Sequence, residues 1–184
     1  MTDRRGDTSP QVLARAAGVL YFLSVFTAVV AEFFFRGQLG FFLAVVVPIS
    51  CYMAVTLLLY LLFRAVNRML VWAAVVFGVA GLVCEALQWK AHGINIGMGA
   101  HGVYCVLIGL LMLRSRFLPR WAGVLMAVGG LVWLMDLAPA VNHRLASFST
   151  VIGLLGEGIP MLWLMVKGVS EEQWKEQAAA PATT

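Results

Sequence analysis

The chain has 184 residues, of which 61% are apolar and 12% are charged. Soluble globular domains are about half apolar and about one quarter charged, so this composition excludes an ordinary soluble enzyme and a disordered chain. The formal net charge of +4 does not indicate nucleic-acid binding, because the basic residues lie between long apolar runs. We therefore expect an integral membrane protein whose main partner is the lipid bilayer and which binds no nucleic acid.

Six apolar runs of about 20 residues, the length needed to cross a bilayer, follow one another along the chain. They lack the alternation of barrel strands, and backbone groups in lipid must be satisfied within the segment, so each run is predicted to be a helix. The loops are short, which favours antiparallel neighbours in one all-α polytopic membrane bundle. The six predicted transmembrane helices cover residues 12–35, 39–63, 69–89, 94–113, 121–141 and 146–166.

The predicted organisation is an N-terminal tail (1–11), a six-helix transmembrane domain (12–168) and a polar C-terminal tail (169–184). The first run is longer than the apolar region of a secretory signal, so we expect it to be retained. Basic residues mark the cytoplasmic side of a membrane protein, and ten lie on one predicted side against three on the other. Both termini are therefore predicted to be cytoplasmic (N-in/C-in), in the cell (inner) membrane. The ten are Arg4, Arg5, Arg15, Arg64, Arg68, Arg114, Arg116, Arg120, Lys167 and Lys175, and the three are Arg36, Lys90 and Arg144.

Ionisable residues inside the apolar runs are the candidate site residues, because a carboxylate in hydrocarbon costs about 2.5–3.5 kcal/mol on insertion scales. In the predicted topology most of them lie toward the outer face and Glu157 lies near mid-membrane. They would fit a polar pocket open to the outside, which would bind a small cation, a proton or an amphiphile. For Glu32 and Asp136, a partly hydrated position near the interface is the favoured alternative. The candidate ligand-binding residues are Glu157, Glu85, Asp136, His101 and Glu32.

A metal site is a weaker hypothesis. Glu85, Gln88 and His92 share one helix face, as do His101 and Cys105 at i and i+4. Carboxylate, imidazole and thiol groups bind soft metals, but the spacings match no specific metal motif. We therefore predict no metal and no cofactor, and we interpret the three cysteines, Cys51, Cys84 and Cys105, as small packing residues.

Glycines are expected to bring helices close together. They are frequent at the start of the fourth run, between Gly93 and Gly102, and in the sixth run at Gly153, Gly156 and Gly158. The sequence Gly156-Glu157-Gly158-Ile159-Pro160 also predicts an easily bent helix around a buried acid, an arrangement that transporters use at mid-membrane.

Several segments resemble DUF4386, a family of uncharacterised bacterial membrane proteins. They are residues 14–23 with 31–37, residues 59–68, the stretch Arg114-Ser115-Arg116-Phe117-Leu118-Pro119-Arg120-Trp121-Ala122-Gly123-Val124-Leu125, and residues 156–168. The connection between the first and second predicted helices is shorter in this chain than in members of the family. It carries Gly78 and Tyr104 where the family commonly has an Arg and a His. The resemblance implies a membrane bundle, and Glu32, Asp136 and Glu157 match the family pattern.

Three functions remain open at this point. The first is a binding or permeation protein with the outward-facing pocket described above. The second is a membrane-embedded enzyme acting on lipid or quinone, with His101 and an acid as proton-transfer groups. The third is a structural or accessory subunit that packs as a homo-oligomer or with a partner membrane protein. The residues contain no known nucleophile or phosphate-binding motif, so enzymatic activity is left undecided.

Overall fold

The computed structural model describes residues 9–34, 40, 42–87, 89–91 and 94–180. Within these residues the regular elements are helices apart from one short two-stranded hairpin, which confirms the predicted all-α class. The elements are α1 (Pro10–Phe34), the π-helical turn η1 (Phe42–Val46), α3 (Val47–Phe63), α4 (Arg68–Ala86), β1 (Lys90–Ala91), β2 (Ile94–Asn95), α5 (Ile96–Arg114), α6 (Arg120–Leu134), the 3-10 turn η2 (Met135–Leu137), α7 (Pro139–Val166) and α8 (Glu171–Ala179).

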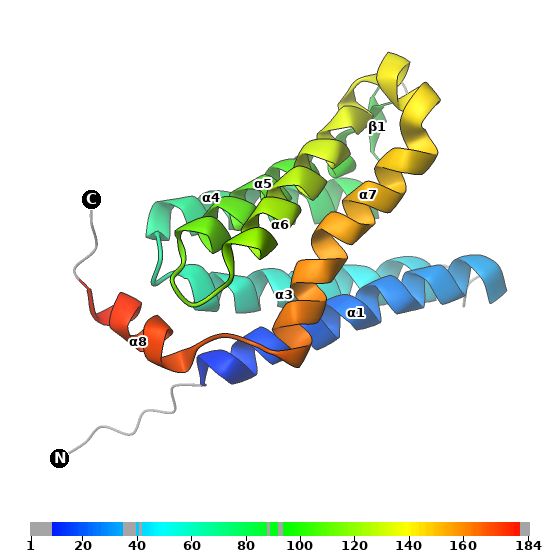
Figure 1. Cartoon of the computed structure of the whole chain (residues 1–184). Helices are drawn as coiled ribbons and strands as arrows, with labels where there is room; N and C mark the ends of the chain where they lie inside the picture. The colour runs from blue at the N-terminus through cyan, green and yellow to red at the C-terminus, as the bar shows by residue number, and fades with distance from the viewer. Residues whose placement is uncertain (1–8, 35–39, 41, 88, 92–93, 181–184) are drawn as a thin grey trace.

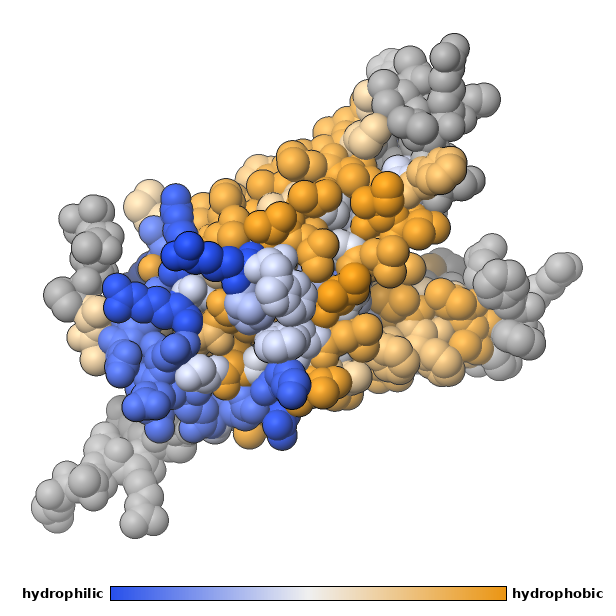
Figure 2. All heavy atoms as spheres, in the orientation of Figure 1, coloured by the Kyte–Doolittle hydropathy of each residue, from blue (hydrophilic) through white to orange (hydrophobic). Residues whose placement is uncertain are grey.

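Four of the described helices are long and apolar enough to cross a membrane by length and composition: α1, α4, α5 and α7. Helices α3 and α6 are apolar but shorter; η1 precedes α3 and η2 follows α6 directly. Large apolar side chains are exposed on the outside, including Phe26 at 54% and Val76 at 61%. Figure 2 shows this hydrophobic surface over most of one face, with hydrophilic residues gathered at the end that carries α8. The exterior therefore suits lipid as its surroundings.

Six helices form a closed ring, in which each packs against its neighbours in the order α1, α3, α4, α5, α6, α7 and back to α1. In Figure 1, α4, α5 and α6 form one layer. Helix α7 starts at the top of this layer and ends beside the first part of α1. The α5–α6 contact is the most extensive and the α3–α4 contact is the least extensive in this ring. The middle of the ring is therefore enclosed by side chains from several helices.

Glycine allows the close approach of α5 and α6, and of the glycines in this contact only Gly102 was among those predicted to pack helices together. A Cβ atom at Gly130 would lie 2.7 Å from the carbonyl oxygen of Gly102, and one at Gly109 would lie 2.6 Å from the backbone nitrogen of Ala127. On α7, a Cβ at Gly156 would lie 2.6 Å from the Cα of Gly129. Gly158 differs, because a Cβ there meets nothing within 4 Å. The small residues thus draw α5, α6 and α7 together around one side of the ring.

The helix ends follow from local sequence signals. The Asn67 side chain accepts a hydrogen bond from the Leu70 backbone N–H at 2.8 Å and caps α4. Asn95 caps α5 in the same way through the Met98 N–H at 3.3 Å. These caps satisfy backbone donors that the first turn of a helix leaves free. Beyond α7, Gly168 has a φ of 71°, a conformation that glycine adopts without strain.

The junction between the fifth and sixth predicted helices was placed wrongly. We expected a loop near residues 142–145, but α6 ends at Leu134 and α7 already begins at Pro139. Pro139 occupies the first turn of α7, where no helical hydrogen bond needs its missing N–H. Ala138 before it has a non-helical backbone (φ −114°, ψ 86°), as expected for a residue that precedes proline. The β1–β2 hairpin, which pairs Lys90 with Asn95 and Ala91 with Ile94, was not predicted either.

Helix α8 lies against the end of the bundle. The Trp174 Nε1–H donates to the carbonyl oxygen of Leu62 at 2.9 Å, and the Gln177 Oε1 accepts from the Arg116 backbone N–H at 3.0 Å. Ser9 also donates to Glu171, which links the beginning of α1 to α8. The polar residues after 168 are therefore held in place as far as Ala179.

Candidate functional site

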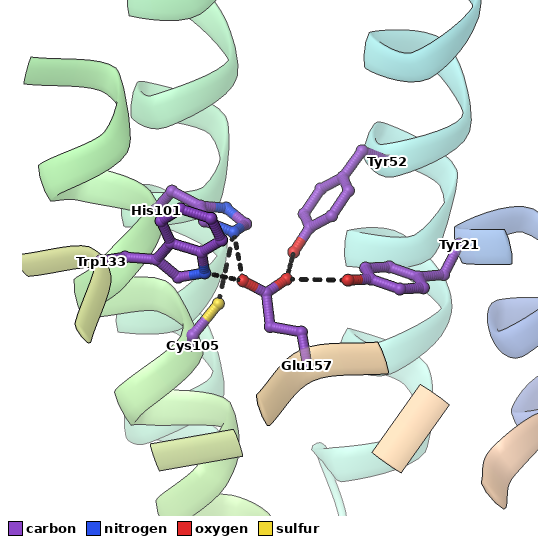
Figure 3. Close-up of polar contacts among 6 residues, drawn as sticks. All are labelled: Tyr21, Tyr52, His101, Cys105, Trp133 and Glu157. Carbon is purple, nitrogen blue, oxygen red and sulfur yellow. Dashed lines mark hydrogen bonds and ion pairs between the residues drawn. The ribbon is translucent and has the colours of Figure 1, made fainter. Parts of the chain in front are cut away.

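Glu157 is the centre of a buried polar cluster. It lies near the middle of α7 and its side chain is 3% exposed. Four side chains hydrogen-bond to its carboxylate, each from a different helix (Figure 3). The hydroxyls of Tyr21 (α1) and Tyr52 (α3) both donate to Oε2 at 3.3 Å. On the other oxygen, Oε1, the His101 (α5) Nε2 lies at 2.8 Å and the Trp133 (α6) indole N–H donates.

This geometry explains how the bundle accommodates an acid in its interior. Both carboxylate oxygens have two partners, so the hydrogen-bonding capacity of the group is largely used. Hydrogen bonds to charged groups are stronger than bonds between neutral groups. Glu157 therefore acts as a common acceptor that joins α1, α3, α5 and α6 to α7.

His101 connects this cluster to a cavity. The side chain is 21% exposed, and its ring packs edge-on against Tyr52 at a centroid distance of 5.2 Å. The Nε2 that faces Glu157 also lies 3.5 Å from the Sγ of Cys105, one turn further along α5. Cys105 itself is fully buried. When Nε2 carries the ring proton, the histidine donates that proton to the Glu157 carboxylate.

The cavity has a volume of about 210 Å³ and lies between the α1–α3 pair and the α4–α5 pair. It occupies the half of the bundle near the β1–β2 hairpin, since it reaches Glu85 at the end of α4 and Gly97 at the start of α5. Apolar residues form most of its wall: Val45, Pro48, Ile49, Leu82 and Met98. The polar part of its lining consists of Ser24, Tyr52, Glu85 and His101.

Glu85 belongs to the wall of this cavity rather than to the cluster around Glu157. It is half-buried and its Oε2 accepts a hydrogen bond from the Asn95 side-chain amide at 3.3 Å. Because Asn95 also caps α5, it holds the carboxylate beside the first turn of that helix. Glu85 thus adds a carboxylate to the cavity wall at the end of α4, and His101 adds an imidazole from α5.

Of the five predicted site residues, the structure brings Glu157 and His101 into direct contact and places Glu85 in the cavity that His101 lines. The side chains of Glu32 and Asp136 lie outside the described part of the structure, as do Gln88 and His92, so their predicted roles stay predictions. Tyr21, Tyr52 and Trp133 were not among the predicted site residues, and Cys105 was predicted only as a packing residue or a possible metal ligand. A usable signal was present, because these aromatic polar residues lie inside spans and not at the membrane interface, where Tyr and Trp usually anchor.

Gly78 of α4 and Tyr104 of α5 pack directly against one another. The Tyr104 ring fills the space over Gly78, where a Cβ would lie 2.9 Å from the ring. Tyr104 is almost fully buried, and its ring packs against Tyr52 and His101 at centroid distances of 5.9 and 6.1 Å. A larger side chain at position 78 would therefore require the Tyr104 ring to move.

Comparisons with known proteins agree with the resemblance seen in the sequence. A protein from Archaeoglobus fulgidus, described as an uncharacterized protein, is 26% identical over 141 residues, which cover 70% of this chain and 82% of that protein. No solved structure gives a significant match. Residues 82–168 match the family model described as Domain of unknown function (DUF4386). The matched region contains Glu85, His101, Cys105, Trp133 and Glu157, so these residues lie in the part of the chain that is similar to DUF4386.

Proposed function

We propose that this chain is an integral membrane protein that binds a small cationic or amphiphilic ligand in a cavity open toward the outer face. The observation that carries the proposal is the His101–Glu157 pair, which joins a buried carboxylate to the cavity through a contact of 2.8 Å. Membrane-buried ionisable groups usually mark ligand or ion sites, because their insertion is costly. Packing alone does not need such a pair.

The proposed topology has six spans, with both termini on the cytoplasmic side of the cell membrane. It is supported by the basic residues Arg64, Arg68, Arg114, Arg116 and Arg120, which lie at the helix ends on the α8 side. Figure 2 displays the hydrophilic surface at that end. Under the positive-inside rule this end faces the cytoplasm. The β1–β2 hairpin and the cavity then lie toward the opposite, outer face.

The composition of the cavity wall suggests the chemistry of the ligand. Its walls are mainly apolar, which suits a hydrocarbon group, and the Glu85 carboxylate is part of its lining. Opposite charges attract strongly where the effective dielectric constant is low. An alkylamine meets both conditions, because it combines an apolar chain with an ammonium head that can pair with Glu85.

The proposal is tested with radiolabelled n-hexylamine as the probe and equilibrium dialysis of the purified chain in detergent. We expect saturable binding in the wild type, with Glu85→Gln weakening it about tenfold, which corresponds to about 1.4 kcal/mol. Glu171→Gln on α8 is the matched control, because it removes the same charge at the other end of the molecule. Unlabelled hexylamine should compete and hexanol should not. Binding that Glu85→Gln leaves at the wild-type affinity, or equal competition by hexanol, contradicts the proposal.

The same pair supports a second candidate, a membrane-embedded enzyme acting on lipid or quinone. A general acid–base pair must lie within hydrogen-bonding distance of its proton partner, and 2.8 Å between His101 Nε2 and Glu157 Oε1 meets that condition. This candidate predicts that solvent extraction of the purified chain releases a stoichiometric quinone or lipid. It also predicts that Glu157→Gln retains the molecule while blocking its conversion, whereas loss of the molecule itself favours a binding role.

A further inference from the structure

We propose that His101, Cys105 and Glu157 form a zinc-binding site inside the bundle. The His101 ring nitrogen, the Cys105 sulfur and a Glu157 carboxylate oxygen all lie within 4.8 Å of one another. Helix α5 supplies two of these ligands one turn apart, and α7 supplies the third (Figure 3). This inference goes beyond the ligand-binding function proposed above and does not depend on it.

The separations between the ligand atoms suit a tetrahedral ion. The Cys105 Sγ lies 3.5 Å from the His101 Nε2, and ordinary Zn–N and Zn–S bonds place such atoms about 3.6 Å apart. The His101 Nε2 and the Glu157 Oε1 are 2.8 Å apart, the distance of a hydrogen bond. Zinc replaces that hydrogen bond when the carboxylate draws back by about half an ångström, because Zn–N and Zn–O bonds separate their atoms by about 3.4 Å.

The charges of the ligands also suit a buried divalent ion. One thiolate and one carboxylate balance the two positive charges of Zn²⁺, and the imidazole is neutral when it binds a metal. The centre is then electrically neutral, which matters because uncompensated charge is costly in a low-dielectric interior. Binding of the ion releases the thiol proton of Cys105, and the His101 imidazole stays neutral with its proton on Nδ1 while Nε2 binds the metal.

The mixture of donor atoms selects the metal. Thiolates favour copper(I), zinc and iron–sulfur clusters, whereas carboxylates favour harder ions. Zinc accepts sulfur, nitrogen and oxygen ligands in a single tetrahedral site. Glu157 also has hydrogen bonds from Tyr21, Tyr52 and Trp133, and such outer partners orient a metal ligand. Three protein ligands leave a fourth position, as in catalytic zinc sites.

The test measures zinc in the full-length chain, purified in detergent with a tag that contains no histidine. The chain is stripped with a chelator, reloaded with Zn²⁺ and dialysed, and the zinc-to-protein ratio is measured by mass spectrometry. We expect one zinc per chain. Loss of an outer partner lowers metal affinity by about 10–100-fold, so Cys105→Ser and His101→Ala should lower it by about 100-fold or more. The matched control is Cys84→Ser, which removes another buried thiol on α4.

Cobalt substitution keeps the proposal testable if a variant fails to fold. Co²⁺ bound to a thiolate gives a sulfur-to-cobalt charge-transfer band in the near ultraviolet, which is read in the wild-type chain itself. Absence of this band, or zinc binding that survives Cys105→Ser at the wild-type affinity, overturns the proposal. The two proposals separate cleanly, since Glu85→Gln should weaken hexylamine binding and leave zinc in place, whereas Cys105→Ser should do the reverse.

Discussion

Replacing Glu157 by Leu tests whether the buried carboxylate stabilises the bundle. Hydropathy alone predicts the opposite, because insertion scales favour Leu over an acid at the centre of a helix by about 3 kcal/mol. That difference describes the transfer of a helix from water into the bilayer. The stability of the bundle is instead measured against separate helices that are already in the bilayer. From that reference state the substitution removes the acceptor of four hydrogen bonds, given by Tyr21, Tyr52, His101 and Trp133.

The expected loss follows from these four bonds. Hydrogen bonds between membrane helices contribute on average about 0.6 kcal/mol each, so Glu157→Leu should destabilise the bundle by about 2.5 kcal/mol. This corresponds to a roughly 60-fold change in the folding equilibrium. Glu157→Gln is the matched control, because its amide oxygen can still accept from Trp133 while both tyrosine hydroxyls can turn to accept from its amide nitrogen. We expect it to lose about half as much.

The measurement is equilibrium unfolding in mixed detergent micelles with increasing dodecyl sulfate, followed by circular dichroism. Circular dichroism is preferred because tryptophan fluorescence would report directly on Trp133, whose environment the substitution changes. The reasoning is refuted if Glu157→Leu is as stable as the wild type, or more stable. That outcome would mean that the four donors find equally good partners without the carboxylate.

Three further predictions concern the scaffold. Gly130→Ala should destabilise the chain by about 1–3 kcal/mol, because the added methyl group meets the α5 backbone, whereas Gly158→Ala, in open space, should be neutral or slightly stabilising in the same unfolding assay. Trp174→Phe removes the indole hydrogen bond to Leu62, so it should lower the free energy of unfolding by about 1 kcal/mol and speed protease cleavage of α8. Its control is Lys175→Ala, which breaks only an exposed ion pair and should change the free energy of unfolding by less than about 0.5 kcal/mol. A cysteine introduced at Lys90 should react with an impermeant maleimide added to intact cells, and protection there would reverse the proposed topology.

The helices were predictable because the length of an apolar run reports directly on the thickness of the bilayer. Each of the six predicted spans overlaps a helix among the described residues, and four of these helices are long and apolar enough to cross a membrane. The boundaries were less accurate where apolar and polar residues mix. Pro139 starts α7 even though polar residues follow it, so the polar stretch 142–145 was wrongly interpreted as a loop.

The site was only partly predictable, for a physical reason. In a membrane bundle both the lipid-facing and the core-facing positions are apolar, so periodicity does not show which side of a helix points inward. The predicted depths of His101 and Glu157 were compatible with contact, but the contact itself joins residues 56 positions apart. The same limit hid the third ligand of the proposed zinc site, because His101 and Cys105 share a face by spacing alone while Glu157 joins them only through the packing of α7.

One side chain, that of Glu157, links helices on both sides of the ring. Helices α1 and α3 hold one oxygen of Glu157, and α5 and α6 hold the other. The two halves cannot separate at this level unless the carboxylate gives up one pair of donors. Any proton, metal ion or ligand that changes the partners of this group therefore acts on both halves of the ring at once.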